Sequence, residues 1–323
     1  MKKQPNSNNI GNLMNGSSGL LRAPLGKIDD AEGESVPQNL PLIVDAHVHL
    51  FPDPFFASVW QWFDQYGWPI RYRLKSSDVI EFLHSKGVDH IVALQYAHKP
   101  GIARMLNDYM IGLCNRYPRI TGMATVFPGE KHAADILADG FRNGLSGLKL
   151  HAHVQCFEME SDAMQEVYEV CIDYNKPLIM HVGREPKSPA YACDPYEICS
   201  ADKLENVIKT HPELKVCVPH LGADEFDDYQ RMIEVYDNLW LDTTMALAQY
   251  LSDSWSPDLS AFRPDRVMYG SDFPNLPYAW DRELRRFSKL NLPEDSLAMI
   301  LGKNAAEFYA IPSRELVTLN NPD

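Results

Sequence analysis

The feature that most constrains the fold is a regular alternation of short apolar segments with longer helical ones. Segments such as 76–87, 101–117 and 161–176 repeat apolar residues at helical spacing. Runs that are nearly continuously apolar and rich in β-branched residues are typical of parallel strands covered on both faces. Eight such runs occur, at residues 42–50, 90–96, 120–127, 145–152, 176–183, 215–222, 238–245 and 266–273. The chain therefore predicts an α/β protein built on parallel strands.

The spacing of these strands favours a closed barrel over an open sheet. The strand ends are expected at residues 49, 96, 127, 151, 181, 220, 243 and 272, which lie 23 to 47 residues apart. That is the spacing of β–α–β units. A doubly wound sheet alternates in the same way, but eight units with polar residues at most strand ends fit a barrel better. We predict a single-domain (β/α)8 TIM barrel over residues 41–312.

The first forty residues do not share this pattern. Residues 1–40 mix Asn, Ser, Gly and Pro without a sustained apolar period. They can bury too little apolar surface to offset the entropy lost on ordering. We expect a flexible leader here; an arm packed on the barrel or on a second subunit is the alternative. Residues 313–323 are expected to form a C-terminal tail.

Composition excludes several classes of protein. The 30 basic and 44 acidic side chains leave a formal charge of −14, and a general nucleic-acid binder needs a basic surface instead. A membrane-spanning helix needs a run of about 18 apolar residues, and the sequence has none. The amino terminus lacks the apolar region of a secretion signal. The six cysteines include no CxxC pair, so the cytoplasm is the expected compartment.

Polar residues at the strand ends carry the candidate chemistry, because the carboxyl ends of barrel strands meet around one mouth. His47 and His49 are two residues apart and so leave the same face of an extended chain. His181, His220 and Asp272 end three further strands. Imidazoles together with a carboxylate are ligands for a cation such as zinc. We predict a divalent metal site at this mouth, although any one of these histidines alone is as typical of a hydrogen-bonded core residue.

Several segments resemble the amidohydrolase superfamily, and most closely its amidohydrolase-2 branch of small metal-dependent hydrolases and decarboxylases. They are VDAHVHLFP (44–52), GLKLH (147–151), MHVG (180–183), PHLG (219–222) and YGSDFP (269–274). The resemblance covers roughly residues 41–311. It implies that one divalent metal, most often zinc with manganese or iron(II) as alternatives, is held by His47, His49, His181 and Asp272. It also implies that His220 stands beside the metal as a further ligand, a proton carrier or an electrophile.

Two of these residues have expected catalytic roles. A metal held by imidazoles lowers the pKa of its bound water to about 7. Asp272 is expected to take a proton from that water and to return it to a leaving group. His220 is expected to polarise the substrate carbonyl or to stabilise the oxyanion.

The fourth strand leaves alternatives open. Lys149, His151 and His153 share a face if the strand stays extended. In some amidohydrolases a carbamylated lysine of this strand bridges two metals, whereas the resemblance favours one metal here. Lys149 otherwise pairs with an acidic side chain or with a substrate carboxylate. We expect His151 to contact substrate and His153 to lie on the surface.

Two loops are expected to shape the substrate site. Arg184 and Lys187, after the fifth strand, are candidates to clamp a substrate carboxylate or phosphate, or else form salt bridges in solvent. The aromatic segment 52–69 is expected to wall or roof an apolar site, with a homodimer contact as the alternative. Asp45 is expected to orient the two neighbouring histidines.

These residues favour a metal-dependent hydrolase that acts on a small-molecule amide, ester or lactone. The alternative is a metal-dependent decarboxylase of an unsaturated or aromatic acid, which the same resemblance permits. A third hypothesis is a barrel that binds a metal or ligand without turnover. Such a protein is expected to have lost a ligand residue, and none is lost here.

Overall fold

The computed structural model describes residues 29–185, 187–250, 257–312 and 316. The tail predicted over 313–323 therefore lies, apart from one residue, outside the described part. Each of the eight apolar segments contains one strand. The strands are β1 (Val44–His49), β2 (His90–Leu94), β3 (Ile120–Gly122), β4 (Leu148–His151), β5 (Leu178–His181), β6 (Val216–Val218), β7 (Leu239–Asp242) and β8 (Val267–Met268).

The strands close into a barrel. All neighbouring strands are parallel, and they form two ladders, β1-β2-β3 and β4-β5-β6-β7-β8. Ala124 bridges to Leu148 between the third and fourth strands, and Val48 bridges to Phe273 between the last strand's end and the first. These two bridges join the ladders on both sides, which confirms the predicted (β/α)8 barrel.

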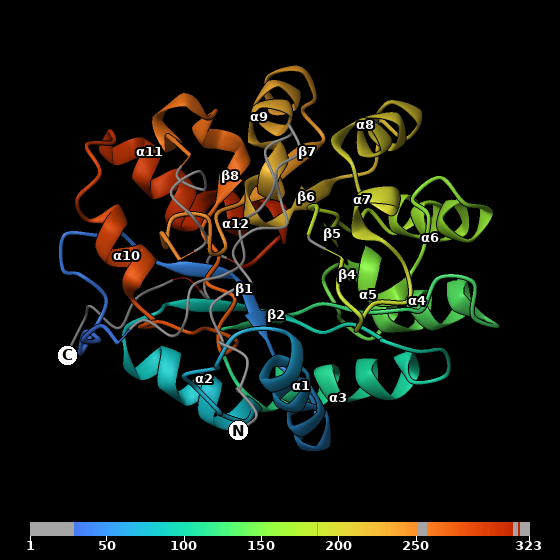
Figure 1. Ribbon diagram of the computed structural model, residues 1–323, viewed down its shortest axis with the longest axis horizontal. Helices are drawn as coiled ribbons and strands as arrows, with labels where there is room; N and C mark the ends of the chain where they lie inside the picture. Colours follow the sequence, from blue (N-terminus) through green and yellow to red (C-terminus); the bar gives the residue numbers. More distant parts are fainter. Residues whose placement is uncertain (1–28, 186, 251–256, 313–315, 317–323) are drawn as a thin grey trace, which may run out of the picture.

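Helices surround the strands (Figure 1). The predicted helical segments 76–87, 101–117 and 161–176 are confirmed: they contain α2 (Ser76–Ser85), α3 (Ala103–Arg116) and α6 (Asp162–Asp173). Within the described part of the chain, no helix has both the length and the apolarity needed to cross a bilayer. The helices are α1 (Asp53–Tyr66), α2 (Ser76–Ser85), α3 (Ala103–Arg116), α4 (Ala133–Arg142), α5 (Ala152–Gln155), α6 (Asp162–Asp173), α7 (Pro195–Ile198), α8 (Ala201–Thr210), α9 (Phe226–Val235), α10 (Arg282–Phe287), α11 (Glu294–Ala298) and α12 (Asn304–Phe308), with 3-10 turns η1 (Pro219–Glu225), η2 (Leu259–Ala261) and η3 (Pro264–Arg266) and a π turn η4 (Met299–Lys303).

The barrel interior is layered, because alternate residues of a strand point to opposite faces. Its lower layer is one buried apolar cluster, to which the strands contribute Ile179, Cys217 and Met268 and α12 contributes Phe308. Two residues beyond Ile179, the same face of β5 carries His181. The apolar floor therefore gives way to polar groups at the carboxyl ends of the strands.

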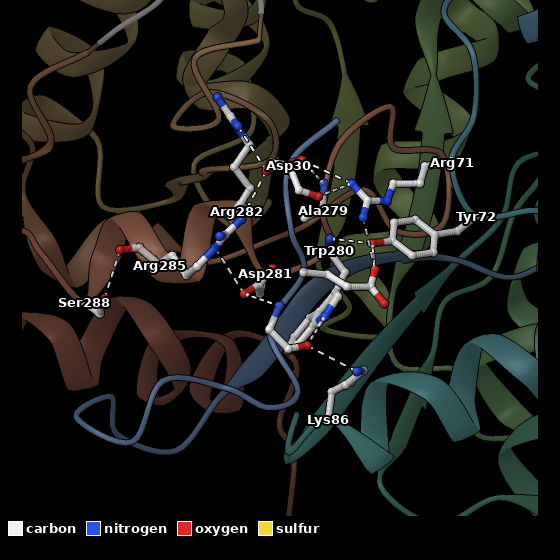
Figure 2. A network of polar contacts seen from close by, with 12 residues as sticks. Asp30, Arg71, Tyr72, Lys86, Ala279, Trp280, Asp281, Arg282, Arg285 and Ser288 are labelled. Atoms are coloured by element: carbon white, nitrogen blue, oxygen red, sulfur yellow. Dashed lines mark hydrogen bonds and ion pairs between the residues drawn. The ribbon is translucent and has the colours of Figure 1, made fainter. Parts of the chain in front are cut away.

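An arm before β1 packs against the barrel, and Asp30 is its main anchor (Figure 2). The Asp30 carboxylate accepts hydrogen bonds from Arg71 at 3.1 Å and from Arg282 at 3.0 Å. It also accepts from the backbone N–H of Ala279 at 3.0 Å and from Arg285 at 3.1 Å. One carboxylate thus ties the arm to the loop after α1 and to α10.

Further contacts hold the arm against the segment after β8. The backbone N–H of Gly33 donates to Asp281 at 3.0 Å, and the Trp280 indole donates to the Gly33 carbonyl at 3.2 Å (Figure 2). Residues 29–40 therefore follow the packed-arm alternative rather than the flexible leader. The rest of that expected leader, residues 1–28, lies outside the described residues.

We expect Asp30→Asn to lower the free energy of unfolding by about 2 kcal/mol, because three arginines lose a shared charged acceptor. Burial alone would raise the pKa of Asp30, but hydrogen bonds from Ala279 and Arg282 and the charge of Arg282 outweigh it and lower the pKa. A carboxyl group whose pKa is lowered by folding stabilises the fold at pH values above its ordinary pKa of 3.8. This stabilisation is lost as the pH falls through the folded-state pKa.

Urea unfolding at pH 7 and at successively lower pH tests this expectation. The gap between wild type and Asp30→Asn should be full at pH 7 and should close in acid. Asp29→Asn is the matched control, because it removes the same charge from an exposed neighbour. Equal stabilities for the two variants at pH 7 would contradict the anchoring role.

Candidate metal centre

The first candidate ligand group comprises His47 and His49 of β1 and Asp272, which follows β8. The backbone N–H of Asp272 donates to the His47 carbonyl at 2.9 Å, which draws the two strand ends together. Asp272 Oδ1 lies 2.9 Å from His49 Nε2 and 3.5 Å from His47 Nε2. All three residues are buried, and their ligand atoms lie within 4.8 Å of one another.

These residues fit a divalent metal. Tetrahedral ligand atoms about 2.1 Å from zinc are separated by about 3.4 Å, close to the distances from Asp272 Oδ1 to the two imidazoles. Burial, followed by the charge of Lys149, lowers the pKa of His47 well below its ordinary value, so the imidazole is neutral. Burial would raise the pKa of Asp272, but its hydrogen bond and electrostatic interaction with His49 lower it to about 2. Neutral imidazole and ionised carboxylate are the forms that bind a metal.

The side chain that orients His47 is Asp242, at the end of β7, which was not among the predicted site residues. Its Oδ2 accepts a hydrogen bond from His47 Nδ1 at 2.8 Å. Its Oδ1 accepts from the backbone N–H groups of His220 at 3.2 Å and Thr244 at 3.1 Å. Because Nδ1 carries the proton, His47 Nε2 is left with its lone pair toward Asp272, as metal-binding histidines commonly require. Its position at the end of an expected strand was the one sequence signal that could have identified Asp242.

Asp45 hydrogen-bonds to backbone groups and not to the histidine rings. Its Oδ1 accepts hydrogen bonds from the backbone N–H groups of His47 at 3.2 Å and Ser271 at 3.0 Å. Burial raises the pKa of Asp45 to about 7. Asp45 therefore joins β1 to the segment that leads into Asp272, and the expected orientation of the histidines is indirect.

His220 lies beside the first group without belonging to it. Its Nδ1 donates to the Thr244 carbonyl at 2.8 Å, and its Nε2 lies 3.3 Å from His181 Nδ1. The ring centroids of His47 and His220 are 6.0 Å apart. The backbone of His220 is left-handed, with φ at 59°, a conformation that non-glycine residues adopt at a cost. Gly222 continues this turn, and a Cβ there would lie 1.9 Å from the Tyr229 ring.

His181 joins a second group, with His151 and His153. The register pairs His151 with His181 across β4 and β5, and their rings are parallel at 4.1 Å. The ligand atoms of the three histidines lie within 4.8 Å of one another. Burial lowers the pKa of His181 to about 3. Membership of His181 in the first ligand set stays a prediction.

The expectation that His153 lies on the surface is wrong. His153 is fully buried, and its ring centroid lies 5.1 Å from that of His181. An exposed position was the default expectation for a residue in the loop beyond the fourth strand. β4 does end at His151, but the chain then turns into the short helix α5. The helical turn directs His153 toward the neighbouring strand end.

Glu185, in the loop after β5, bridges two of these histidines and was not predicted. Its Oε1 lies 3.2 Å from His181 Nε2, and its Oε2 lies 3.3 Å from His153 Nε2. The Tyr191 hydroxyl donates to Oε2 at 3.1 Å. Burial would raise the pKa of Glu185, but His153 and His181 hold it well below its usual range, so the side chain is ionised. A loop residue carries no periodic signal, so only the unusual loop length pointed to this segment.

Lys149 lies inside the barrel and is completely buried. Its Nζ has no hydrogen-bond partner among the described residues, so the structure shows no acidic partner bonded to it. Burial lowers the pKa of Lys149 to about 8, although the charges of Asp242 and Asp272 act in the opposite direction. A carbamate at Lys149 and a contact with a substrate carboxylate stay predictions.

The two cations of the loop after β5 are paired within the protein. Arg184 lies 3.3 Å from Glu225 and donates to the Cys199 carbonyl. Lys187, which is mostly exposed, lies 3.4 Å from Asp194. Both residues follow the salt-bridge alternative.

Aromatic rings line the group of histidines. Phe51 lies parallel to His49 with ring centroids 6.0 Å apart. The Tyr96 ring is steeply inclined to those of His49 and His151, with ring centroids 5.9 Å and 5.1 Å away. Trp62 of α1 contacts Tyr191 at 5.7 Å. The aromatic segment thus reaches the loop that carries Glu185, and its role in a subunit contact stays a prediction.

We expect Asp242→Asn to weaken zinc or manganese binding at the first group 10- to 100-fold, because the charged partner of the His47 ring is lost. Competition with a chromophoric chelator measures the affinity. Asp237→Asn, at an exposed carboxylate just before β7, is the matched control and should bind metal like wild type. Equal affinity in both variants would show that Asp242 does not support the ligand.

Comparison with known proteins bears on these groups. The model of the family described as Amidohydrolase matches residues 44–311. A search of the curated proteins finds no match.

Solved structures share the fold at low sequence identity. An uncharacterized TIM-barrel protein from Bordetella bronchiseptica is 18% identical, with a TM-score of 0.65 over 84% of this chain and 99% of that one. A 5-carboxyvanillate decarboxylase from Novosphingobium aromaticivorans, complexed with manganese and 4-hydroxy-3-methoxy-5-nitrobenzoic acid, is 15% identical, with a TM-score of 0.61 over 87% and 100%. A 2,6-dihydroxybenzoate decarboxylase from Rhizobium is 15% identical, with a TM-score of 0.60 over 84% and 99%. The family match extends over nearly the whole barrel, and this chain therefore belongs to the amidohydrolase family.

Proposed function

We propose that this protein is a metal-dependent hydrolase that cleaves an amide, ester or lactone bond in a small molecule. The support is the first ligand group, in which His47, His49 and Asp272 present three buried ligand atoms within 4.8 Å. Three protein ligands leave a further coordination position free, as in catalytic zinc sites. A divalent ion bound there lowers the pKa of a bound water to about 7 and so supplies a nucleophile at neutral pH.

Asp272 and His220 divide the proton chemistry in this proposal. Asp272 is ionised, because its pKa is lowered to about 2, so it can accept a proton from water and pass it to the leaving group. The Nδ1 proton of His220 is committed to the Thr244 carbonyl. Its Nε2 therefore accepts a proton in the neutral ring, and it donates to a substrate oxygen only when the ring is doubly protonated.

One observation favours hydrolysis over decarboxylation: the two cations of the loop after β5 are already paired. Recognition of an anionic substrate commonly uses a free arginine or lysine. Arg184 and Lys187 already pair with Glu225 and Asp194. A neutral amide, ester or lactone does not require either cation.

Decarboxylation of an unsaturated or aromatic acid is the second candidate. Two of the similar structures are decarboxylases of aromatic acids, and Phe51 and Tyr96 would offer aromatic surface to such a ring. Unpartnered Lys149 is the cation that a substrate carboxylate would approach. At 15% identity these structures share the fold with this chain, and the reaction must be measured.

Product analysis of the metal-loaded protein separates the two reactions. We expect hydrolysis of members of a panel of lactones, esters and amides, with one ¹⁸O atom from labelled water in each acid product. A panel of hydroxybenzoic acids should release no carbon dioxide. Carbon dioxide release without ester, lactone or amide turnover would replace the hydrolase proposal with the decarboxylase. Bound metal with no turnover of either panel would favour the non-catalytic barrel.

Replacing Asp272 or His220 by Asn should each lower kcat by about 10²- to 10⁴-fold, because a positioned proton carrier is lost. Rates are expressed per bound metal, measured on the same samples, since Asp272 also lies in the ligand group. His98→Asn, which removes an exposed histidine, is the control and should retain wild-type kcat. Full turnover in both site variants would remove these two roles.

A further inference from the structure

We propose that Cys156 and Cys193 form a redox-sensitive modification site, at which a low-molecular-weight disulfide oxidises the two thiols to a bridge that fixes the loop after β5. Cys156 directly follows α5, and Cys193 lies in the loop after β5. The two residues are far apart in the sequence and form no spacing motif, so only the fold brings them together. The inference does not depend on which reaction the barrel performs.

A shared hydrogen-bond acceptor is the first argument. The Cys156 thiol donates to the His153 carbonyl oxygen at 3.4 Å, and the Cys193 thiol donates to the same oxygen at 3.3 Å. Burial and a hydrogen bond with Cys156 raise the pKa of Cys193 to about 12, so the two thiols also contact each other. Thiols in contact need only a short further approach to reach the S–S distance of about 2.05 Å.

The difference in exposure between the two thiols is the second argument. Among the six cysteines, all of which the structure describes, Cys156 alone is exposed and Cys193 is half-buried. Cys171, Cys199 and Cys217 are buried. An oxidant in solvent reaches an exposed thiol first. A second thiol held beside the first is placed to displace the oxidant and to complete a disulfide within the protein.

The reaction is thiol–disulfide exchange in two steps, with oxidised glutathione as the oxidant. The deprotonated Cys156 sulfur attacks one glutathione sulfur, forms a mixed disulfide and releases a glutathione thiolate, which takes up the proton. The Cys193 sulfur then attacks the Cys156 sulfur and closes the protein disulfide, and its proton passes to the second glutathione. The two protein thiols lose two electrons and two protons, and one oxidised glutathione becomes two reduced molecules. Excess reduced glutathione reverses both steps.

The loop that carries Cys193 contacts the histidines at the barrel mouth. Tyr191, two residues before Cys193, donates to Glu185 at 3.1 Å, and its ring centroid lies 4.6 Å from that of His153. In the reduced protein these are noncovalent contacts. A disulfide to Cys156 would join the loop covalently to the end of α5. It would thereby hold Tyr191 against His153 and fix one wall of the mouth.

Oxidation of the full chain tests the proposal without a substrate. The protein is incubated with oxidised glutathione, alkylated and digested, and its disulfides are assigned by mass spectrometry. We expect a Cys156–Cys193 disulfide in wild type that dithiothreitol removes. Cys193→Ser should instead accumulate glutathione at Cys156, whereas Cys156→Ser should react far more slowly at Cys193. Cys114→Ser, at a half-buried position on α3, is the control and should form the disulfide like wild type.

Hydrogen exchange measures the effect on the loop. Backbone amide exchange across residues 187–199 should slow severalfold in oxidised wild type, because a tethered segment opens less often. It should be unchanged by oxidant in Cys193→Ser, or in Cys193→Ala if the serine variant does not fold by circular dichroism. Unmodified cysteines, a glutathione adduct that persists at Cys156 in wild type, or a disulfide to Cys199 or to a second chain would each overturn the proposal. Unchanged exchange after the disulfide has formed would overturn it as well.

Discussion

The candidate metal centre depends above all on the buried carboxylate of Asp242. Its two oxygens accept hydrogen bonds from the His47 ring and from the backbone N–H groups of His220 and Thr244. One side chain on β7 thereby sets the orientation of a histidine on β1 and the backbone turn after β6. A charged acceptor in a buried position interacts strongly with its donors. The free-energy cost of burying this carboxylate is offset only if those donors stay in place. The ends of β1, β6 and β7 are therefore positioned together.

The barrel concentrates polar residues at one mouth because its floor is apolar. The lower layer of the interior packs against α12 and excludes water. At the carboxyl ends of the strands, His220 contacts His181, and its ring centroid lies 6.0 Å from that of His47.

Sequence patterns predicted the residues whose position follows from strand periodicity. His47 and His49 share a face because they are two residues apart in an extended strand, and the structure confirms this through their common approach to Asp272. His153 was expected on the surface because it lies beyond the strand, and it is buried because the helical turn of α5 directs it beside His151. Glu185 lies in a loop, where no period relates a residue to a face. The arm around Asp30 had no sustained apolar pattern; it is held by polar contacts, and Val36 and Leu40 pack against the core.

The sequence by itself determined the order of strands and helices, the barrel and the meeting of His47, His49 and Asp272 at its mouth, because each depends on local periodicity and on strand ends meeting there. Only the tertiary structure decided that Asp242 orients His47, that His181 lies with His151 and His153, and that Arg184 and Lys187 are paired. Those outcomes depend on loop paths and on side-chain contacts between residues distant in the chain. Such contacts are selected by burial and by hydrogen bonding in the folded protein, which no local pattern records.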